Sequence, residues 1–446
     1  MKQILFLLST IVLFITAFGQ GKSEKLDELL KAYANQSRFN GSVLVIKDGE
    51  TLLDKGYGLS NVKENLSNNP NTIFQVGSIT KQFTAAIILK LQEEKKINIQ
   101  DKLSKYFPGY PNGDSITIEH LLTHTSGIYS YTNDREFMSS KVSIPHTRQQ
   151  MISLFKDKPL QFTPGTKWRY SNSGYLLLGY IIEDLTGLTY QEAVRQYIFN
   201  PLQMRNSGFD YTQLNNQQKA TGYSQLVDEM NTSATSIDST ISFASGSIYA
   251  TTADLYKFQQ GIQSHAIISK STLEKASTPF MNNYGYGFEI DSVAGKRIIG
   301  HSGSIHGFVS NMVWVPGENT VVILLNNATS PHLGKITHNI ISLLYDQPYE
   351  LPVLKVAISM PEKTLQQYTG VYEIAPQFAI TVSLVNGSLI GTPQGQESRK
   401  LHPEKEDQFF LKEVDGQFKF TRNDENEITA VILIQSGKEI IGKRIK

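Results

Sequence analysis

A serine three residues before a lysine can act as a nucleophile and its proton acceptor, because residues three apart share one face of a helix. The chain contains this spacing three times. The three pairs are Ser78–Lys81, Ser60–Lys63 and Ser153–Lys156. Most such pairs are helix caps with a solvated lysine, so the spacing by itself does not identify a catalytic site.

The residues after Ser78 set the first pair apart. The segment 83–91 is apolar nearly all round, which predicts a helix buried in the middle of a domain. Burial would lower the pKa of Lys81 from about 10.4 toward neutrality, where a lysine can serve as a base. The backbone N–H of Ser78 would lie at the positive end of the helix, where it can stabilise an oxyanion. We therefore predict Ser78 as the nucleophile and Lys81 as its base.

Two further motifs follow in order along the chain. "WRYSNSGY" contains Tyr170 and Asn172, and "GHSGSIHGF" contains His301, Ser302 and Gly303 just before a predicted strand. Each motif is weak alone, because its pattern recurs elsewhere in the chain. The three motifs in this order, with predicted helices between the first two, together indicate one active site.

With these motifs the sequence resembles the serine β-lactamase and penicillin-binding-protein superfamily. The nearest branch holds class C β-lactamases, D-Ala-D-Ala carboxypeptidases, D-aminopeptidases and related esterases. "HLLTHTSGI", "YLLLGYIIEDLTG" and "YGYGFEI" are similar to stretches typical of that branch, and the resemblance covers residues 26–345. The C-terminal part resembles the lipocalin-like β extension that some members carry.

The resemblance implies a role for each motif residue. Ser78 would be the acylated nucleophile and Lys81 its proton acceptor. Tyr170, as a phenolate or a hydrogen-bonded phenol, would pass the proton to the leaving group and activate water for deacylation. Asn172 would position the substrate and Lys81. The backbone N–H groups of Ser78 and Ser304 would form the oxyanion hole.

Two departures from the family pattern matter for specificity. Tyr-Ser-Asn replaces the Ser-Asp-Asn of class A enzymes. His301 stands where most β-lactamases have a lysine that holds the substrate carboxylate, and a histidine with a pKa near 6.5 is mostly neutral at pH 7. Ser302, Gly303 and the strand backbone would then position the substrate through hydrogen bonds. We therefore expect a peptidase or esterase rather than an efficient β-lactamase, and tighter binding of carboxylate substrates as the pH falls.

The elements that must position these residues indicate an α+β fold. "GSVLVIKDGETLLDKGYG" predicts two strands around an Asp48-Gly49 turn. The middle of the chain is mostly helical, with one helix ending at Gly187 and the next capped by Thr189. Strands return in the segment 284–327, before an amphipathic helix at 336–345. This order predicts one antiparallel sheet built from both ends of the domain, flanked by helices, with an all-helical subdomain.

Composition shifts predict the domain boundaries. The hydrolase domain is expected over 20–347, a proline-containing linker over 348–361, and a lipocalin-like β domain over 362–446. The last segment has short β-like runs with turn signals at Asn386-Gly387, Asp415-Gly416 and Ser436-Gly437. These signals predict a small antiparallel β-barrel or meander.

The N-terminus has the pattern of a targeting segment. Met1-Lys2 is followed by an apolar run at 4–18 and by the small residues Ala17 and Gly19, which predicts a cleaved signal peptide at 1–19. An uncleaved anchor is the alternative, but the run is shorter than a span of about 20 residues. No later stretch is apolar enough to cross a bilayer. We expect an exported protein, periplasmic or secreted, without a stable membrane span after cleavage.

Composition excludes several other functions. The net charge of +1 and the lack of a long basic stretch argue against a nucleic-acid partner, and the absence of cysteine excludes disulfides and thiolate chemistry. His120 and His124 have the i, i+4 spacing of metal ligands, but Leu121 stands where a zinc protease has its glutamate. We predict no metal and no cofactor.

The sequence therefore predicts an exported serine hydrolase that forms an acyl-enzyme on Ser78. Its expected substrates are small D-amino-acid peptides, amides or esters, with peptides ending in D-Ala-D-Ala as the leading candidate. A broad-scope esterase or a β-lactamase of the same fold is the alternative within the enzyme class. A penicillin-binding sensor that is acylated without turnover is the alternative of another class. The oligomeric state is left open.

Overall fold

The computed structural model describes residues 21–446 except 228–229, 353–354, 413, 415 and 436–437. The predicted signal peptide, and the predicted turns at Asp415 and at Ser436-Gly437, lie wholly or partly outside the described residues. The chain forms two compact units, the first built mainly from Phe39–Thr329 and the second mainly from Leu351–Lys446. Each unit has its own hydrophobic core.

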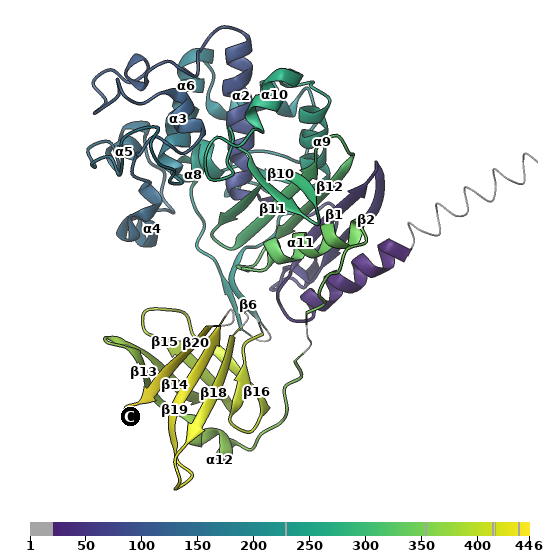
Figure 1. The fold of residues 1–446 in the computed structure, drawn as a ribbon, viewed down its shortest axis with the longest axis vertical. Helices are drawn as coiled ribbons and strands as arrows, with labels where there is room; N and C mark the ends of the chain where they lie inside the picture. The colour runs from purple at the N-terminus through teal and green to yellow at the C-terminus, as the bar shows by residue number, and fades with distance from the viewer. Residues whose placement is uncertain (1–20, 228–229, 353–354, 413, 415, 436–437) are drawn as a thin grey trace, which may run out of the picture. The chain divides into compact units, whose positions relative to one another are not determined.

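The first unit is built on a six-stranded antiparallel sheet with the strand order β2-β1-β12-β11-β10-β9 (Figure 1). The strands are β1 (Gly41–Lys47), β2 (Glu50–Tyr57), β9 (Glu289–Val293), β10 (Lys296–Ile305), β11 (Phe308–Val315) and β12 (Thr320–Asn326). Because β1 pairs with β12, both ends of the domain sequence meet in one sheet, as predicted. Every residue of β12 is buried, which is typical of a central strand covered on both faces.

Two local features of the sheet matter for the site. Asp48 and Gly49 join β1 to β2 with φ values of +52° and +86°, as the predicted tight hairpin turn requires. On the other side of the sheet, β9 pairs only with the segment Lys296–Gly300 of β10. The second half of β10, from His301 onward, therefore extends beyond β9 along that edge.

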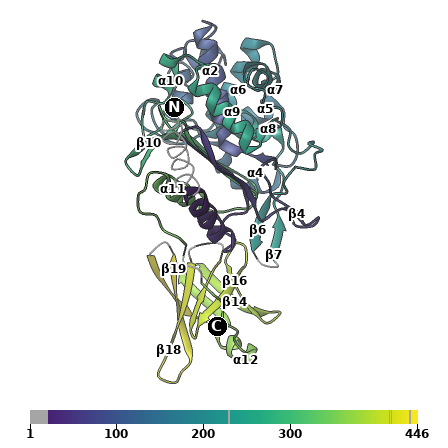
Figure 2. The same ribbon diagram turned by 90° about the vertical axis from the view of Figure 1, so that its right-hand side faces the viewer.

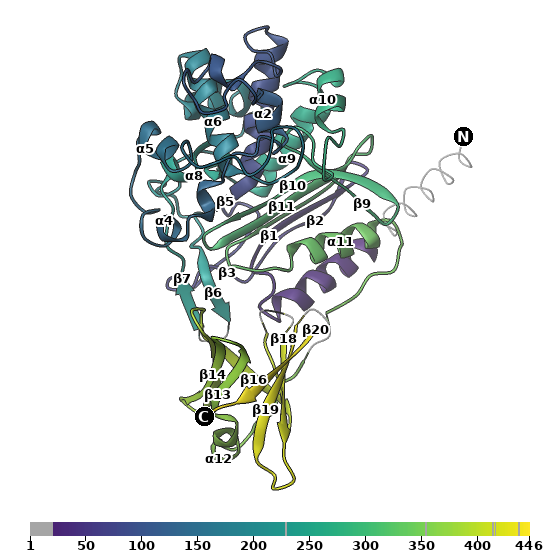
Figure 3. The same cartoon turned by 60° about the vertical axis from the view of Figure 1, so that its left-hand side comes forward.

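Helices cover both faces of this sheet (Figure 3). Residues 21–34 are helical and lie on one face together with α11 (Leu333–Leu344), which packs on β11 and β12. On the other face, α9 (Thr252–Gln263) packs on β1 and β12. The helix α2 (Thr80–Glu93) has 11 of its 14 residues buried, so it is the central helix that the apolar run predicted.

The helical subdomain surrounds α2. Its helices are α3 (Ile118–Leu122), α4 (Arg135–Ser140), α5 (Arg148–Ser153), α6 (Asn172–Thr186), α7 (Tyr190–Val194) and α8 (Ser239–Gly246), with α10 (Lys270–Ala276) beside α9. As predicted, α6 ends at Gly187, which has the left-handed φ of +71°, and Thr189 caps α7 through a capping box with Glu192.

Short elements complete the first unit. They are the strands β3 (Leu59–Asn61), β4 (Leu66–Ser67), β5 (Phe74–Gln75), β6 (Tyr223–Val227), β7 (Met230–Ser233) and β8 (Tyr249–Ala250), the 3₁₀-helical turns η1 (Gly77–Ile79), η2 (Leu103–Lys105) and η3 (Tyr131–Asn133), and the π-helical segment η4 (Arg195–Phe199). In the described residues, no helix is both long and apolar enough to span a bilayer.

The second unit is a closed antiparallel barrel of eight strands, visible along its side in Figure 2. The elements are α12 (Glu362–Leu365), η5 (Gln366–Tyr368), β13 (Gly370–Ala375), β14 (Phe378–Val385), β15 (Ser388–Pro393), β16 (Arg399–Lys405), β17 (Gln408–Phe410), β18 (Gly416–Arg422), β19 (Ile428–Gln435) and β20 (Lys438–Arg444). Asn386 and Gly387 form the predicted turn between β14 and β15, both with positive φ. Of the two predicted forms, the barrel is the one observed.

Candidate active site

Ser78 lies in η1, a single turn of 3₁₀-helix that leads directly into α2. Its hydroxyl does not cap α2, because the N-cap residue is Ile79 and no side chain makes the cap. Gly77 has a φ of +52°, and a Cβ at this position would lie 2.8 Å from the backbone nitrogen of Ser304. A glycine at 77 therefore lets the turn that carries Ser78 lie directly against β10.

The Lys81 side chain is fully buried, and its Nζ lies within hydrogen-bond distance of three oxygens. It lies 3.1 Å from Ser78 Oγ, 2.8 Å from Asn172 Oδ1 and 2.8 Å from the Ser245 carbonyl oxygen. Burial lowers the pKa of Lys81 well below its ordinary value, and the negative charge of Glu289 opposes this shift. The low pKa favours a neutral amine.

The three contacts match the needs of a neutral amine. The oxygens of Asn172 and Ser245 can only accept hydrogen bonds, so the two N–H groups of a neutral Lys81 would donate to them. Its lone pair would then face the Ser78 hydroxyl, as a general base requires. In the other two serine–lysine pairs, Ser60 Oγ and Ser153 Oγ instead donate to nearby backbone carbonyls, so neither has this geometry.

The Asn172 amide is held in one orientation. Its Nδ2 donates to Thr132 Oγ1 at 3.0 Å, and its backbone N–H donates to Ser130 Oγ at 3.0 Å. Because Thr132 Oγ1 accepts the hydrogen bond from the amide nitrogen, the amide oxygen faces Lys81. Ser130 and Thr132 were not predicted as site residues. They come directly after the "HTSGI" stretch, and their hydroxyl groups are the one feature of the sequence that could have indicated this role.

The Ser245 carbonyl is a second feature that sequence reasoning missed. It lies in α8, where Phe243 has φ and ψ of 35° and −132°, far from helical values. This kink turns two consecutive carbonyls toward α2: Ala244 O accepts from Thr84 Oγ1 at 2.6 Å, and Ser245 O accepts from Lys81. Backbone strain of this kind costs about 1–3 kcal/mol and is typical of functional sites.

Tyr170 lies beside Lys81, whose Nζ is 4.8 Å from the centroid of the tyrosine ring. Burial raises the pKa of Tyr170 well above its ordinary value; the Ser78 hydroxyl opposes this shift, and the charge of Glu289 adds to it. The resting side chain is therefore a phenol, which is one of the two forms considered from the sequence.

The ring of His124 packs against the ring of Tyr170. The two ring centroids are 4.2 Å apart, and His124 Nδ1 accepts a hydrogen bond from the backbone N–H of Ser171 at 3.2 Å. Burial lowers the pKa of His124 well below its ordinary value, and a positive charge on Lys81 or His301 would lower it further. The neutral ring is thus a positioning group for the Tyr170-Ser171-Asn172 turn.

The possible metal pair, His120 and His124, does not converge. His120 Nδ1 accepts a hydrogen bond from the backbone N–H of Thr117, so it belongs to the capping box that starts α3. His124 instead faces Ser171 and Tyr170. Among the residues that the structure describes, no cluster of three or more potential ligands suited to a metal ion occurs.

The third motif lies on the extension of β10 that passes β9. Gly303 packs tightly against η1: a Cβ there would lie 2.1 Å from Val76 O, which also accepts a hydrogen bond from Ser310 Oγ at 2.7 Å. Next to this contact, the backbone of Ser304 packs against Gly77. The backbone N–H groups of Ser78 and Ser304 thus belong to two segments in direct contact.

His301 is buried and does not line the cavity beside Ser78. Its Nδ1 donates to the Ser302 carbonyl at 2.5 Å, since that oxygen can only accept, and Tyr284 O–H therefore donates to Nε2 at 2.9 Å. Burial and the charge of Lys81 lower the pKa of His301, although Glu289 and the Ser302 carbonyl raise it, so protonation occurs below the value near 6.5 expected from the sequence.

Ser302 is exposed but already has a carboxylate partner within the chain. Its backbone N–H donates to Glu289 Oε2 and its Oγ donates to Glu289 Oε1, both at 3.0 Å. Glu289 stands at the start of β9, opposite Gly300. No role was predicted for Glu289, although the stretch "YGYGFEI" contains it.

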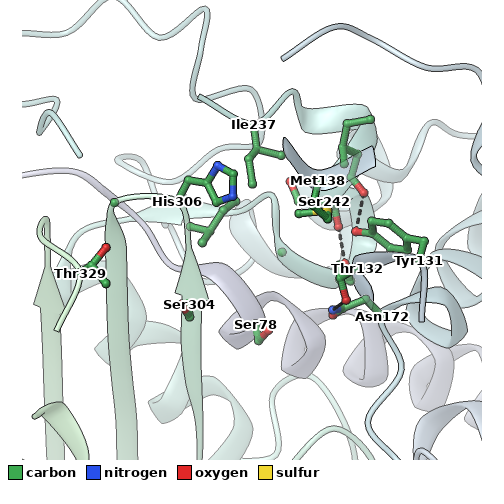
Figure 4. A pocket seen from close by; sticks show the side chains of 15 residues that line it. Ser78, Tyr131, Thr132, Met138, Asn172, Ile237, Ser242, Ser304, His306 and Thr329 are labelled. Carbon is green, nitrogen blue, oxygen red and sulfur yellow. Dashed lines mark hydrogen bonds between the residues drawn. The ribbon is translucent and has the colours of Figure 1, made fainter. Parts of the chain in front are cut away.

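A cavity of about 380 Å³ opens beside Ser78. In Figure 4, Ser78 lies between Ser304 on one side and Asn172 with Thr132 on the other. The lining residues are Ser78, Tyr131, Thr132, Met138, Asn172, Ile237, Ile241, Ser242, Ser245, Gly246, Ser304, Ile305, His306, Gly307 and Thr329. The described lining thus combines hydroxyl and amide groups near Ser78 with an apolar wall, and contains no lysine, arginine or carboxylate.

Comparisons with known proteins agree with this geometry. The beta-lactamase family model matches residues 26–345, and a model described as a domain of unknown function, DUF3471, matches residues 354–444. The teichoic acid D-alanine hydrolase of Staphylococcus aureus is 28% identical over 72% of this chain and 81% of its own length.

Two solved structures are also similar. The octameric penicillin-binding protein homologue from Pyrococcus abyssi is 27% identical, with a TM-score of 0.66 over 94% of this chain and 99% of that chain. The D-stereospecific amidohydrolase from Streptomyces sp. is 26% identical, with a TM-score of 0.61 over 70% of this chain and 98% of that chain. The chain therefore belongs to the beta-lactamase family and is a serine hydrolase.

Proposed function

We propose that the protein hydrolyses D-amino-acid peptides, amides or esters through an acyl-enzyme on Ser78. The single observation that carries this proposal is the environment of Lys81 Nζ, which is buried among Ser78 Oγ, Asn172 Oδ1 and the Ser245 carbonyl. Two of these oxygens fix the amine, and the third belongs to the hydroxyl group that it would deprotonate.

In acylation, Ser78 Oγ attacks the substrate carbonyl carbon and its proton passes to the neutral Lys81. The backbone N–H groups of Ser78 and Ser304 would hold the oxyanion. When the bond to the leaving group breaks, the phenol of Tyr170 protonates the departing nitrogen or oxygen and regains a proton from Lys81. The products are the acyl-Ser78 ester and the free leaving group.

In deacylation, water attacks the ester carbon and its proton passes through Tyr170 to Lys81. The bond between the acyl carbon and Ser78 Oγ then breaks, and Oγ recovers a proton from Lys81. The acid product leaves, and both bases return to their resting forms. Asn172 keeps Lys81 in place during both steps.

The proposed substrate class draws on the cavity and on the relatives. The space beside Ser78 is small and partly apolar, which suits a compact acyl group such as a D-amino acid residue. Two similar proteins are named for D-alanine hydrolysis and for D-stereospecific amide hydrolysis. The signal-like N-terminus adds the proposal that the enzyme acts outside the cytoplasm, which N-terminal sequencing of the mature protein would test.

The direct test is intact-mass spectrometry during turnover of an activated D-alanyl ester. We expect a mass increase equal to the acyl group in the wild type, and loss of both adduct and turnover in Ser78→Ala with an unchanged circular dichroism spectrum. Ser60→Ala and Ser153→Ala are matched controls that should retain turnover. Residual activity of Ser78→Ala within tenfold of wild type would refute the proposal.

The same measurement with a β-lactam separates the alternative functions. A persistent adduct without ester turnover would favour a penicillin-binding sensor. A transient adduct would favour a β-lactamase, and ester turnover without any β-lactam adduct would favour an esterase.

A further inference from the structure

Glu289 occupies the donors that the third motif would offer to a substrate carboxylate. Its two side-chain oxygens accept the backbone N–H and the Oγ of Ser302, each at 3.0 Å. Ser302 lies just past the stretch of β10 that pairs with β9, so no strand residue accepts its hydrogen bonds on that side. The Glu289 carboxylate accepts them instead. The protein thus supplies its own carboxylate at this point.

The charge of Glu289 is not neutralised by a neighbouring base. In the described part of the chain, its one partner within ion-pair distance is His301 Nδ1, at 3.6 Å, and the pKa of His301 is lowered by burial. The Glu289 side chain is 43% exposed, so the charge can reach a bound molecule. The negative charge of Glu289 also raises the pKa values of Lys81 and Tyr170.

The proposed mechanism puts Glu289 on the leaving-group side of Ser78. The acid that protonates the leaving group must face it, and the proposed acid, Tyr170, has its ring centroid 6.3 Å from that of His301. The cavity for the acyl group is lined instead by Asn172 and Ser304 and not by His301. Alternate residues of a strand share a side, so Ser302 lies about 7 Å along β10 from Ser304, toward the leaving group.

We propose that Glu289 selects the leaving group: the enzyme cleaves esters and amides whose leaving group is neutral or positively charged, and discriminates against leaving groups that carry a carboxylate. This inference rests on the proposed acyl transfer to Ser78. A substrate carboxylate near Ser302 would compete with Glu289 for the same donors and would be repelled by its charge. Peptides that end in a free D-alanine carboxylate are therefore poor substrates, whereas D-aminoacyl esters of amino alcohols are good ones.

The test uses three esters of one acyl group, acetyl-D-alanine, with choline, glycolamide or glycolate as the leaving group. We expect wild-type kcat/KM to fall in that order, by roughly three- to tenfold for each unit of charge. The wild-type ratio of the choline to the glycolate value should thus be roughly nine to one hundred, and in Glu289→Gln it should fall toward one. Dividing the choline and glycolate values by the glycolamide value cancels any effect of a changed Lys81 pKa, because that effect is common to all three esters.

Asp291→Asn is the matched control. Asp291 is an exposed carboxylate two residues further along β9, so its removal changes the net charge equally, and the choline-to-glycolate ratio should stay unchanged. A second measurement needs no variant: the wild-type ratio should shrink as ionic strength rises from about 0.01 to 0.5 M, because salt screens exposed charges.

Several results would overturn the inference. The first is equal cleavage of the glycolate and glycolamide esters by the wild type, and the second is a preference for the choline ester that survives in Glu289→Gln. The third is a loss of this preference in Asp291→Asn as large as that in Glu289→Gln. The fourth is a wild-type preference for the glycolate ester that disappears in Arg169→Gln, which removes the exposed cation next to Tyr170 in the chain. Turnover without charge discrimination would overturn this inference alone. Absence of both turnover and Ser78 labelling would overturn the proposed function, and this inference with it.

Discussion

Gly77 lies in direct contact with the backbone of Ser304: a Cβ at Gly77 would be 2.8 Å from the Ser304 nitrogen. This contact brings together a helix start and a strand that are far apart in the sequence. The two N–H groups proposed as the oxyanion hole, from Ser78 and Ser304, come from these two segments. Catalysis should therefore be more sensitive to this contact than the fold is.

Gly77→Ala should reduce kcat at least a hundredfold, because the added methyl group forces Ser304 away from Ser78, and removal of one oxyanion donor has an effect of that size. Gly109→Ala is the control. Gly109 also has positive φ, +74°, but a Cβ there meets no atom within 4 Å. Both variants should lose about 1 kcal/mol or more of unfolding free energy from backbone strain, measured by urea denaturation. Normal kcat in Gly77→Ala would show that the proposed oxyanion hole lies elsewhere.

The pH profile should report the protonation of Lys81. Its pKa is lowered by burial, and the neutral form is the active base, so kcat/KM for a neutral ester should fall as the pH drops through that pKa. Glu289 raises this pKa, so Glu289→Gln should move the acid limb to lower pH. Asp291→Asn should leave the limb in place. A limb that moves to higher pH in Glu289→Gln would contradict the assignment of Lys81 as the base.

Tyr170→Phe should lower kcat by roughly 10²–10⁴, the usual contribution of acid–base catalysis. Phenylalanine should keep the position of this half-buried ring, because it preserves the contact with His124. Stopped-flow measurement of the acyl-enzyme would show whether acylation, deacylation or both are slowed. If neither step changes, Tyr170 is a packing residue.

Thr132→Val should lower kcat/KM by about five- to tenfold, the effect of losing one neutral hydrogen bond. Valine keeps the shape of threonine but leaves Asn172 Nδ2 without its acceptor, so the amide no longer holds Lys81 in one position. The exposed Thr212→Val is the matched control and should behave as wild type in the same steady-state assay. A wild-type rate in Thr132→Val would mean that the Asn172 amide is oriented by other contacts.

Local sequence determined much of the fold. The Asp48-Gly49 turn, the end of α6 at Gly187 and the cap of α7 at Thr189 each depend on the conformational preference of one or two residues, so the pattern predicts them directly. The buried helix after Ser78 was equally readable from its apolar composition. The choice between a meander and a closed barrel at the C-terminus depended on the pairing of β13 with β20, which no local signal contains.

By itself, the sequence also named the residues of the candidate site, because the order of the three motifs is a property of the chain. Only the tertiary structure decided what surrounds them. Asn172 and the Ser245 carbonyl reach Lys81 from 91 and 164 residues away, and every residue has a carbonyl, so Ser245 carried no signal. Likewise, tertiary packing buries His301, and it places the Glu289 carboxylate against Ser302 because β9 begins opposite Gly300, two residues before Ser302 on β10. No local pattern contains either result, because each depends on which segments of the chain lie side by side.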